Sequence, residues 1–148
     1  MRKIKLIVVG SLSEQFKSLA YHYEKNINIF SKLELIEIKE QSQIKNVEEK
    51  KFRETNLILQ HINQNSQTYL LSLNGKSIDS LEFSNLIKLN HNLTFIIGGS
   101  DGVNEKILNN FSKISFSKLT FPHQLFRIML SEQIYRSFMI INNKKYHK

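Results

Sequence analysis

The chain has 148 residues, of which 41% are hydrophobic and 23% charged; this is ordinary usage for one compact domain and argues against a disordered chain. No stretch reaches the ~20 apolar residues of a membrane-spanning helix and no signal peptide is evident, so we expect residues 1–148 to form one cytoplasmic domain. Absence of cysteine excludes disulfides and thiolate chemistry, while the net charge of +8 fits either a nucleic-acid partner or a plain lysine-coated surface.

The first part of the chain alternates strand-like and helix-like segments. Residues 4–10, IKLIVVG, form an apolar β-branched run that ends at glycine, as a buried strand does. Ser11 and Ser13 offer capping hydroxyls for a helix to about Phe30, since apolar residues then recur at helical spacing. Residues 33–38 alternate imperfectly between apolar and charged side chains, which predicts a strand with one wet face near a sheet edge.

A second helix is predicted beyond the polar residues 41–51. Phe52, Leu59 and Ile62 keep helical spacing, so they should form its buried side. The exposed side should carry the charged residues Lys50, Lys51, Arg53 and Glu54.

Residues 69–73 and 93–97 are two further strands of the buried type, with a helix predicted at about 80–90 between them. The pair Asn74-Gly75 should make a turn, because both residue types tolerate positive φ.

The last third is expected to hold two helices around an extended segment. Residues 104–111 should form a short helix, and residues 114–121 a strand or an extended loop. Pro122 suits the first turn of a final helix that ends near Ile141. The apolar stripe of that helix is expected at Phe126, Met129, Leu130, Ile134 and Phe138.

This order of elements predicts an α/β fold with a mostly parallel sheet flanked by helices on both faces. Ligands of such sheets usually bind at the carboxyl ends of the strands. Residues 98–102, GGSDG, follow a predicted strand, and their backbone could approach a ligand closely. The segment matches neither standard nucleotide-binding glycine pattern, so taken alone it is more typical of a tight turn.

Histidines and arginines are the remaining candidates for chemistry. The histidines form no pair with the spacing of metal ligands, so no metal site is expected: His22, His61, His91, His123 and His147. His123 lies beside Pro122 at a predicted helix start, although a structural histidine is the commoner outcome there.

Arg127 and Arg136 lie nine residues apart on the final helix, and we expect them on one face, which could bind phosphate. Glu132 and Arg136 are spaced for an ordinary exposed ion pair, which favours a plain solvated face. The chain ends in KKYHK, where the rings of Tyr146 and His147 could stack on RNA bases, although most such tails are frayed.

Four segments stand in an order far more specific than any one of them: IKLIVVG, LIEIK, LSLNGK and the C-terminal third FIIGGSDGVNEKILNNFSKISFSKLTFPHQLFRIMLSEQIYRSFMIINNKKYHK. In this order they closely resemble the RlmH (YbeA) family of the SPOUT methyltransferase superfamily. The resemblance covers essentially the whole chain, and residues 41–58 match least.

The resemblance implies the SPOUT fold, with a deep trefoil knot in the C-terminal half, and S-adenosylmethionine as methyl donor. Knot loops would hold this cofactor, largely through backbone groups, at Leu71, Gly98, Phe116, Ser117, Lys118, Leu119, Thr120 and Phe121. Ser72 departs from the pattern, because similar proteins usually carry an acidic residue there. A contact to the ribose or amino group of the cofactor could therefore be altered.

The implied reaction is methylation of N3 of a pseudouridine in 23S rRNA of the assembled ribosome, by a twofold dimer in which the partner completes each pocket. Arg127 and Arg136 are candidates to bind the RNA or stabilise the developing anion, and Tyr146 and His147 are further RNA contacts. His123 or the partner subunit's His147 would assist proton removal. Two alternatives stay open: a tRNA methyltransferase of the same superfamily, and a noncatalytic RNA-binding or ribosome-assembly factor.

Overall fold

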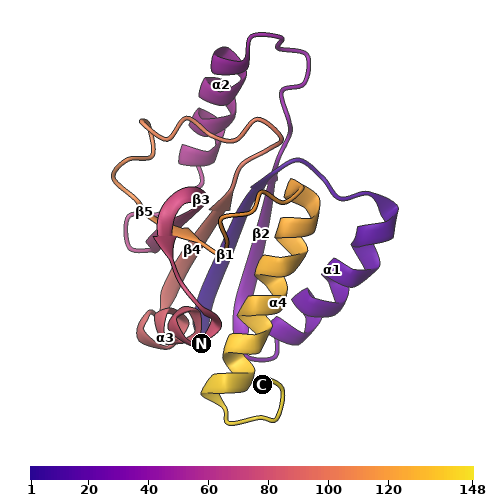
Figure 1. Ribbon diagram of the computed structural model, residues 1–148, viewed down its shortest axis with the longest axis vertical. Coiled ribbons are helices and arrows are strands. Elements are labelled where there is room, and N and C mark those ends of the chain that lie inside the picture. The colour runs from indigo at the N-terminus through magenta and orange to yellow at the C-terminus, as the bar shows by residue number, and fades with distance from the viewer.

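A five-stranded parallel sheet runs through the centre of the computed structural model, which describes residues 1–148 (Figure 1). The strands are β1 (Arg2–Val9), β2 (Ser31–Ile38), β3 (Gln67–Ser77), β4 (Asn92–Ile97) and β5 (Ser112–Ser115). Their order across the sheet is β2-β1-β4-β3-β5, and every neighbouring pair is parallel. The predicted fold class is confirmed, whereas the knot stays a prediction.

Helices cover both faces of the sheet: α1 (Glu14–Ile27), α2 (Val47–Leu59), α3 (Ser80–Leu89) and α4 (His123–Ile141). The even residues of β1, from Ile4 to Val8, pack with apolar residues of α1, α3 and α4 on one face. Ile7 and Val9 pack with Ile58 of α2 on the other face. This burial on both sides explains why residues 6–9 of β1 are all apolar. None of the helices has the length and apolar character needed to cross a lipid bilayer.

The predicted strands and most of the predicted helices are confirmed, with boundaries shifted by a few residues. β2 is an edge strand, as its half-wet pattern indicated. α4 begins directly after Pro122 and ends at Ile141. Most of its predicted stripe is buried, with Leu130, Ile134 and Phe138 at 0–1% exposure.

The predicted orientation of α2 is wrong in part, although Leu59 and Ile62 pack against the core as expected. Phe52 is 53% exposed, whereas Lys50, Glu54 and Thr55 are buried together with Ile58. The polar residues can be buried because they have partners: Lys50 pairs with Asp101, and Thr55 Oγ1 accepts the backbone N–H of Asn104 at 2.9 Å. Satisfied hydrogen bonds remove most of the cost of burying polar groups, so α2 faces the sheet with a mixed surface.

Two further predictions about local structure are wrong. Residues 104–111 form successive turns rather than a helix, with Asn104 Oδ1 accepting the N–H groups of Lys106 and Ile107. Asn74-Gly75 makes no turn, because β3 continues through it and shifts register against β5 between Leu71 and Lys76. Gly75 is required for packing instead, since a Cβ there would lie 2.5 Å from the backbone N of Ile114.

Candidate functional site

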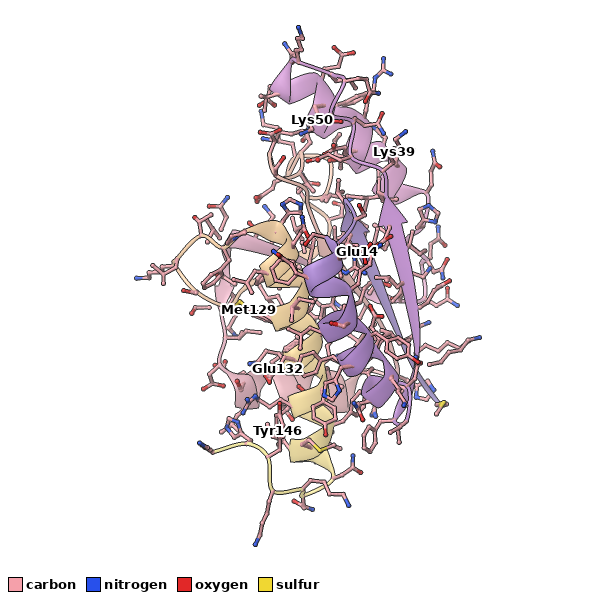
Figure 2. All side chains as sticks on the ribbon, turned by 90° about the vertical axis from the view of Figure 1, so that its right-hand side faces the viewer. Glu14, Lys39, Lys50, Met129, Glu132 and Tyr146 are labelled. Carbon is pink, nitrogen blue, oxygen red and sulfur yellow. The ribbon has the colours of Figure 1, made fainter.

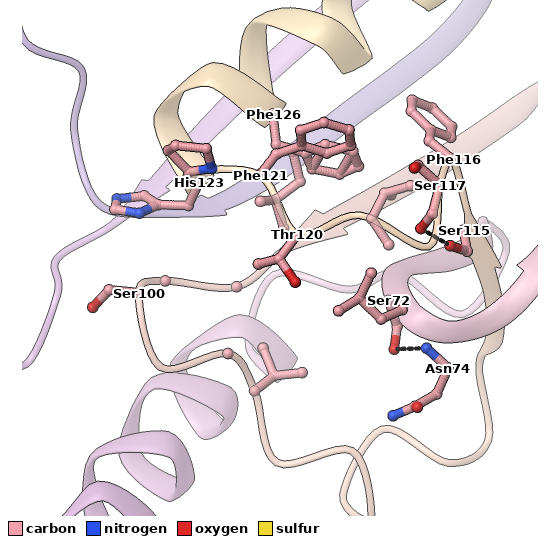
Figure 3. A pocket seen from close by; sticks show the side chains of 18 of the residues that line it. Ser72, Asn74, Ser100, Ser115, Phe116, Ser117, Thr120, Phe121, His123 and Phe126 are labelled. Atoms are coloured by element: carbon pink, nitrogen blue, oxygen red, sulfur yellow. Dashed lines mark hydrogen bonds between the residues drawn. The ribbon is translucent and has the colours of Figure 1, made fainter.

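A cavity of about 840 Å³ opens at the carboxyl ends of three adjacent strands (Figure 3). Its wall is formed by residues 71–74 of β3, residues 97–103 and Glu105 at and after the end of β4, and residues 115–117 and 119–123 at and after the end of β5, with Phe126 of α4. We call it the strand-end cavity. Its volume lies within the ~300–1,000 Å³ typical of sites for small molecules and cofactors.

The strand-end cavity brings together the residues that the family resemblance implied for cofactor binding. All but Lys118 line it: Leu71, Gly98, Phe116, Ser117, Leu119, Thr120 and Phe121. Figure 3 shows the side chains of Ser72, Ser117 and Thr120 around the same hollow. These residues come from three separate parts of the chain, and only the parallel sheet makes them neighbours.

Residues 116–122 lack regular structure, but packing and local hydrogen bonds fix them. The Phe116 ring meets Phe83 and Phe126 edge to face, each at 5.3 Å between ring centroids. The Ser115 hydroxyl donates to the Ser117 carbonyl at 2.9 Å, and the Ser117 hydroxyl accepts from the Leu119 N–H at 3.0 Å. Aromatic pairs of this geometry anchor one side of the loop, which leaves the other side free to line the cavity.

Residues 98–102 form a tight loop that folds against itself. The Gly102 N–H donates to the Gly99 carbonyl at 3.0 Å, and Gly102 has a φ of +80°. A Cβ on Gly98 would lie 2.9 Å from Val103 Cγ1 and 3.0 Å from the carbonyl carbon of Gly102. Gly98 therefore permits the loop to close, in addition to lining the cavity.

Only Asp101 and Glu105 among the lining residues carry a carboxylate, and no lysine or arginine lines the cavity. Asp101 accepts from Lys50 at 2.7 Å. Glu105 accepts from the Ser72 hydroxyl and from Lys113, each at 2.9 Å. Burial alone would raise the pKa of Glu105, but these hydrogen bonds and weaker ones from Asn74 outweigh it and lower the pKa. Glu105 is therefore ionised at neutral pH.

His123 lies at the edge of the strand-end cavity, as the first residue of α4. Its imidazole lies over Gly10, where an added Cβ would be 3.4 Å from His123 Nε2. Gly10 has a φ of +98°, so the chain leaves β1 in a conformation that glycine favours.

Arg127 is 5% exposed and lies outside the cavity wall. Its guanidinium pairs with Glu37 of β2 at 2.5 Å and with Glu24 of α1 at 3.7 Å. The expectation that Arg127 and Arg136 share one face is wrong, because nine residues correspond to two and a half helical turns. Arg127 fixes the start of α4 against α1 and β2.

Arg136 is the centre of a cluster at the other end of α4, which we call the tail cluster: Glu132, Arg136, Tyr146 and His147. Arg136 donates to both carboxylate oxygens of Glu132 at 2.9–3.2 Å. Tyr146 lies with its ring centroid 4.9 Å from the guanidinium carbon, and His147 Nδ1 lies 3.1 Å from Arg136 Nη1. Figure 2 shows Glu132 and Tyr146 together near the C-terminus.

Within one chain, the strand-end cavity and the tail cluster are far apart. His123 and Arg136 are thirteen residues apart on one helix, which corresponds to about 20 Å at ~1.5 Å per residue. The structure therefore joins Arg136, Tyr146 and His147, but it joins none of them to His123. No group of three His, Asp or Glu side chains is placed to hold a metal ion.

Sequence reasoning missed Asp101, Glu105 and the lysines behind them. A signal was present, because both acids follow the end of β4 at Ile97, and ligands of parallel sheets bind at such strand ends. Lys50 and Lys113 carry no such signal, since only the folded chain brings them to the acids.

Residues 2–147 match the model of a family described as predicted SPOUT methyltransferases. The chain is 59% identical over 150 residues to a Mycoplasmopsis agalactiae protein named ribosomal RNA large subunit methyltransferase H, and the match covers both chains fully. A Clostridium botulinum protein of the same name is 45% identical over 157 residues, covering 98% of this chain and 99% of its own.

Two solved structures share the fold. A probable methylase family protein from Haemophilus influenzae has a TM-score of 0.56 at 13% identity, covering 98% of this chain and 70% of its own. A structure titled for 2-OH methylation of C/U34 on tRNA also has a TM-score of 0.56, at 11% identity, covering 97% of this chain and 99% of its own.

Proposed function

The chain belongs to the SPOUT methyltransferase family, and from this premise we propose that it methylates N3 of a pseudouridine in the 23S rRNA of assembled ribosomes, with S-adenosylmethionine as donor. The observation that carries the proposal is full-length identity of up to 59% to proteins named for methylation of large-subunit rRNA. The net charge of +8 supports an RNA substrate. Acting on ribosomes would place the protein in the cytoplasm.

The strand-end cavity fits this cofactor. Its apolar side chains, such as Leu71, Ile97 and Phe116, suit an adenine ring, while the Ser117 and Thr120 hydroxyls and nearby backbone groups suit a ribose. The absence of lysine and arginine from the wall suits a donor with net positive charge. When bound, S-adenosylmethionine would supply a methyl group already activated by its sulfonium.

What the protein must add is alignment and removal of the proton from N3, a weakly acidic imide nitrogen. We assign proton removal to His123, which lines the cavity. Arginine has only hydrogen-bond donors, so in the contact with Arg136 the Nδ1 atom of His147 must be the acceptor. The ring proton of His147 then lies on Nε2. His147 is therefore better suited to bind RNA or orient the base, together with Arg136 and Tyr146. Arg127 keeps only a positioning role, because its guanidinium is already paired.

We further propose that the active form is a twofold homodimer in which the tail cluster of one chain completes the cavity of the other. The distance of about 20 Å between these parts within one chain supports this arrangement. So do Leu119 and Leu125, which are 68% and 38% exposed on the cavity loop and the first turn of α4. Apolar side chains beside an incomplete site suit a partner surface.

The test is methyl transfer from labelled S-adenosylmethionine to ribosomes that lack the modification, followed by nucleoside analysis. We expect N3-methylpseudouridine in 23S rRNA, with naked rRNA and tRNA as poorer acceptors. The matched control is Thr120→Trp, which places a bulky ring at an exposed position of the cavity wall. This variant should block the cavity and abolish methyl transfer. Transfer to tRNA alone would identify a tRNA methyltransferase, and RNA binding without cofactor binding would identify a noncatalytic factor.

A further inference from the structure

The wall of the strand-end cavity carries negative charge although the chain as a whole is strongly basic. Its two carboxylates, Asp101 and Glu105, face a wall without lysine or arginine, and their partners Lys50 and Lys113 are not part of that wall. The negative end of each ion pair is therefore the end nearer the cavity. A ligand there meets a carboxylate at closer range than an ammonium.

Glu105 is better placed than Asp101 to act on a ligand. Asp101 belongs to a cluster on the α2 side, where Lys50 also contacts Glu40 at 3.3 Å. Glu105 instead binds Ser72 and lies within 3.4 Å of the Asn74 side-chain amide, and both of these residues line the cavity. A carboxylate has about four acceptor positions, so the three donors Ser72, Lys113 and Asn74 leave about one position for a ligand.

We propose that Glu105 is a specificity-determining residue, which makes the cavity prefer the positively charged methyl donor to the uncharged thioether that remains after transfer. This inference rests on the proposed function. S-Adenosylmethionine carries a sulfonium and an ammonium against one carboxylate. S-Adenosylhomocysteine has lost the sulfonium charge and is neutral overall. A fixed, ionised Glu105 attracts S-adenosylmethionine more strongly than S-adenosylhomocysteine, which favours binding of the donor and release of the product.

The experiment is calorimetric titration of the full-length protein with S-adenosylmethionine and, separately, with S-adenosylhomocysteine. The variant is Glu105→Gln, which keeps the shape of the side chain and an oxygen for Ser72. We expect its affinity for the donor to fall about fivefold relative to its affinity for the product, the size of one charge interaction in a partly solvated pocket. The control is Glu34→Gln, an exposed acid on edge strand β2 that also pairs with a lysine, and it should leave the ratio unchanged.

Lys113→Gln tests the same inference with the opposite sign and alters no residue of the cavity wall. Without its cation, Glu105 should favour the donor about twofold more strongly than in the native protein, an excess that added salt should reduce. Lys113→Gln therefore still tests the inference if Glu105→Gln folds poorly.

The outcomes separate this inference from the proposed function. In one outcome, Glu105→Gln lowers the affinities for donor and product by the same factor, or neither variant changes the ratio of the two affinities. Glu105 then only holds the loop, and the inference is overturned while the cofactor assignment stands. If the native protein binds neither compound, the proposed function fails first and this inference fails with it.

Discussion

Tyr146 is one of the side chains that hold the chain terminus against α4. Burial raises the pKa of its phenol to about 12, with the nearby Glu132 carboxylate acting in the same direction and Arg136 opposing it. Because this pKa lies above the ordinary value of 10.0, the stability gained from docking Tyr146 is fully present below pH ~10 and is lost as the pH rises toward ~12.

The prediction is that the tyrosinate absorbance of the native protein, minus that of Tyr146→Phe, titrates with a midpoint near 12. The comparison isolates one phenol among five tyrosines. A difference spectrum with a midpoint at the ordinary value would mean that the tail is not docked on α4 in solution.

Glu54 is a buried acid whose charge is poorly compensated. It is fully buried, Oε2 accepts from the Gln41 N–H at 2.8 Å, and Oε1 has no hydrogen-bond partner. Burial raises its pKa, so its contribution to stability is greatest below pH ~4.5 and is lost as the pH rises through its folded pKa.

Glu54→Gln should therefore be more stable than the native protein at neutral pH. The oxygen can still accept from Gln41. The new amide N–H group would lie near Glu40, because a Cβ added at Gly99 would be 3.3 Å from Glu40 Oε1 and 3.5 Å from Glu54 Oε1. Urea unfolding at several pH values measures the difference in unfolding free energy between the variant and the native protein. This difference should shrink as the pH falls. A variant less stable than the native protein at every pH would show that the charge itself is needed there.

At the residue scale, the sequence predicted the site only in part, and the reason is physical. Leu71, Gly98 and the loop from Phe116 were implied by the family resemblance, and the structure brings them together in one cavity. Most of these residues carry no chemical group that composition or spacing would mark as a binding site. Arg127 was misjudged since its partners Glu24 and Glu37 lie about ninety or more residues away in the sequence. Ion pairs of this kind depend on the tertiary fold.

At the scale of elements, α2 is attached to the cavity loop by Lys50, which lies at the far end of the molecule from Tyr146 (Figure 2). Its ammonium contacts Asp101 at 2.7 Å, Glu40 at 3.3 Å and the Ser100 hydroxyl at 3.4 Å. Hydrogen bonding to Asp101 raises the pKa of Lys50 despite burial. One side chain thus connects α2 to two residues of the loop after β4.

Lys50→Met should destabilise the fold by about 2 kcal/mol, less than the loss of a fully buried ion pair because Glu40 and Asp101 keep partial access to water. It should also weaken cofactor binding through the displaced loop. The control is Lys51→Met, whose only ion pair is the surface contact with Glu48, and it should change the unfolding free energy by less than ~0.5 kcal/mol. Equal effects of the two variants in urea unfolding would contradict this role.

Elements that follow simple periodicity were predictable, and those stabilised by unusual contacts were not. β1 and β4 are buried on both faces, so their apolar composition alone identifies them as strands of a buried sheet. α2 buries the polar residues Lys50 and Thr55 beside the apolar Ile58, because both polar groups find partners that only the folded chain supplies. The Asn74-Gly75 pair is typical of turns, yet the neighbouring β5 extends β3 through it, an outcome decided by pairing between distant segments.

At the scale of the whole molecule, the strand-end cavity and the tail cluster lie at opposite ends of α4. A chain that acts alone would need its tail to travel about 20 Å, whereas a twofold partner with an antiparallel α4 brings a tail to each cavity without rearrangement. Each active site would then use both chains. A chain with a defective cavity and a chain with a defective tail could therefore form one working site together.

Complementation between inactive variants tests this arrangement. Thr120→Trp blocks the cavity but keeps the tail, and a chain lacking residues 144–148 keeps the cavity but loses Tyr146 and His147 of the tail cluster. Mixed and re-equilibrated, they should form mixed dimers with one intact site each, and methyl transfer should recover to about one quarter of the native rate if chains pair at random. Each variant alone should stay inactive, and their dimeric state can be checked by light scattering. No recovery in a sample proven to contain mixed dimers would mean that each chain carries its own complete site.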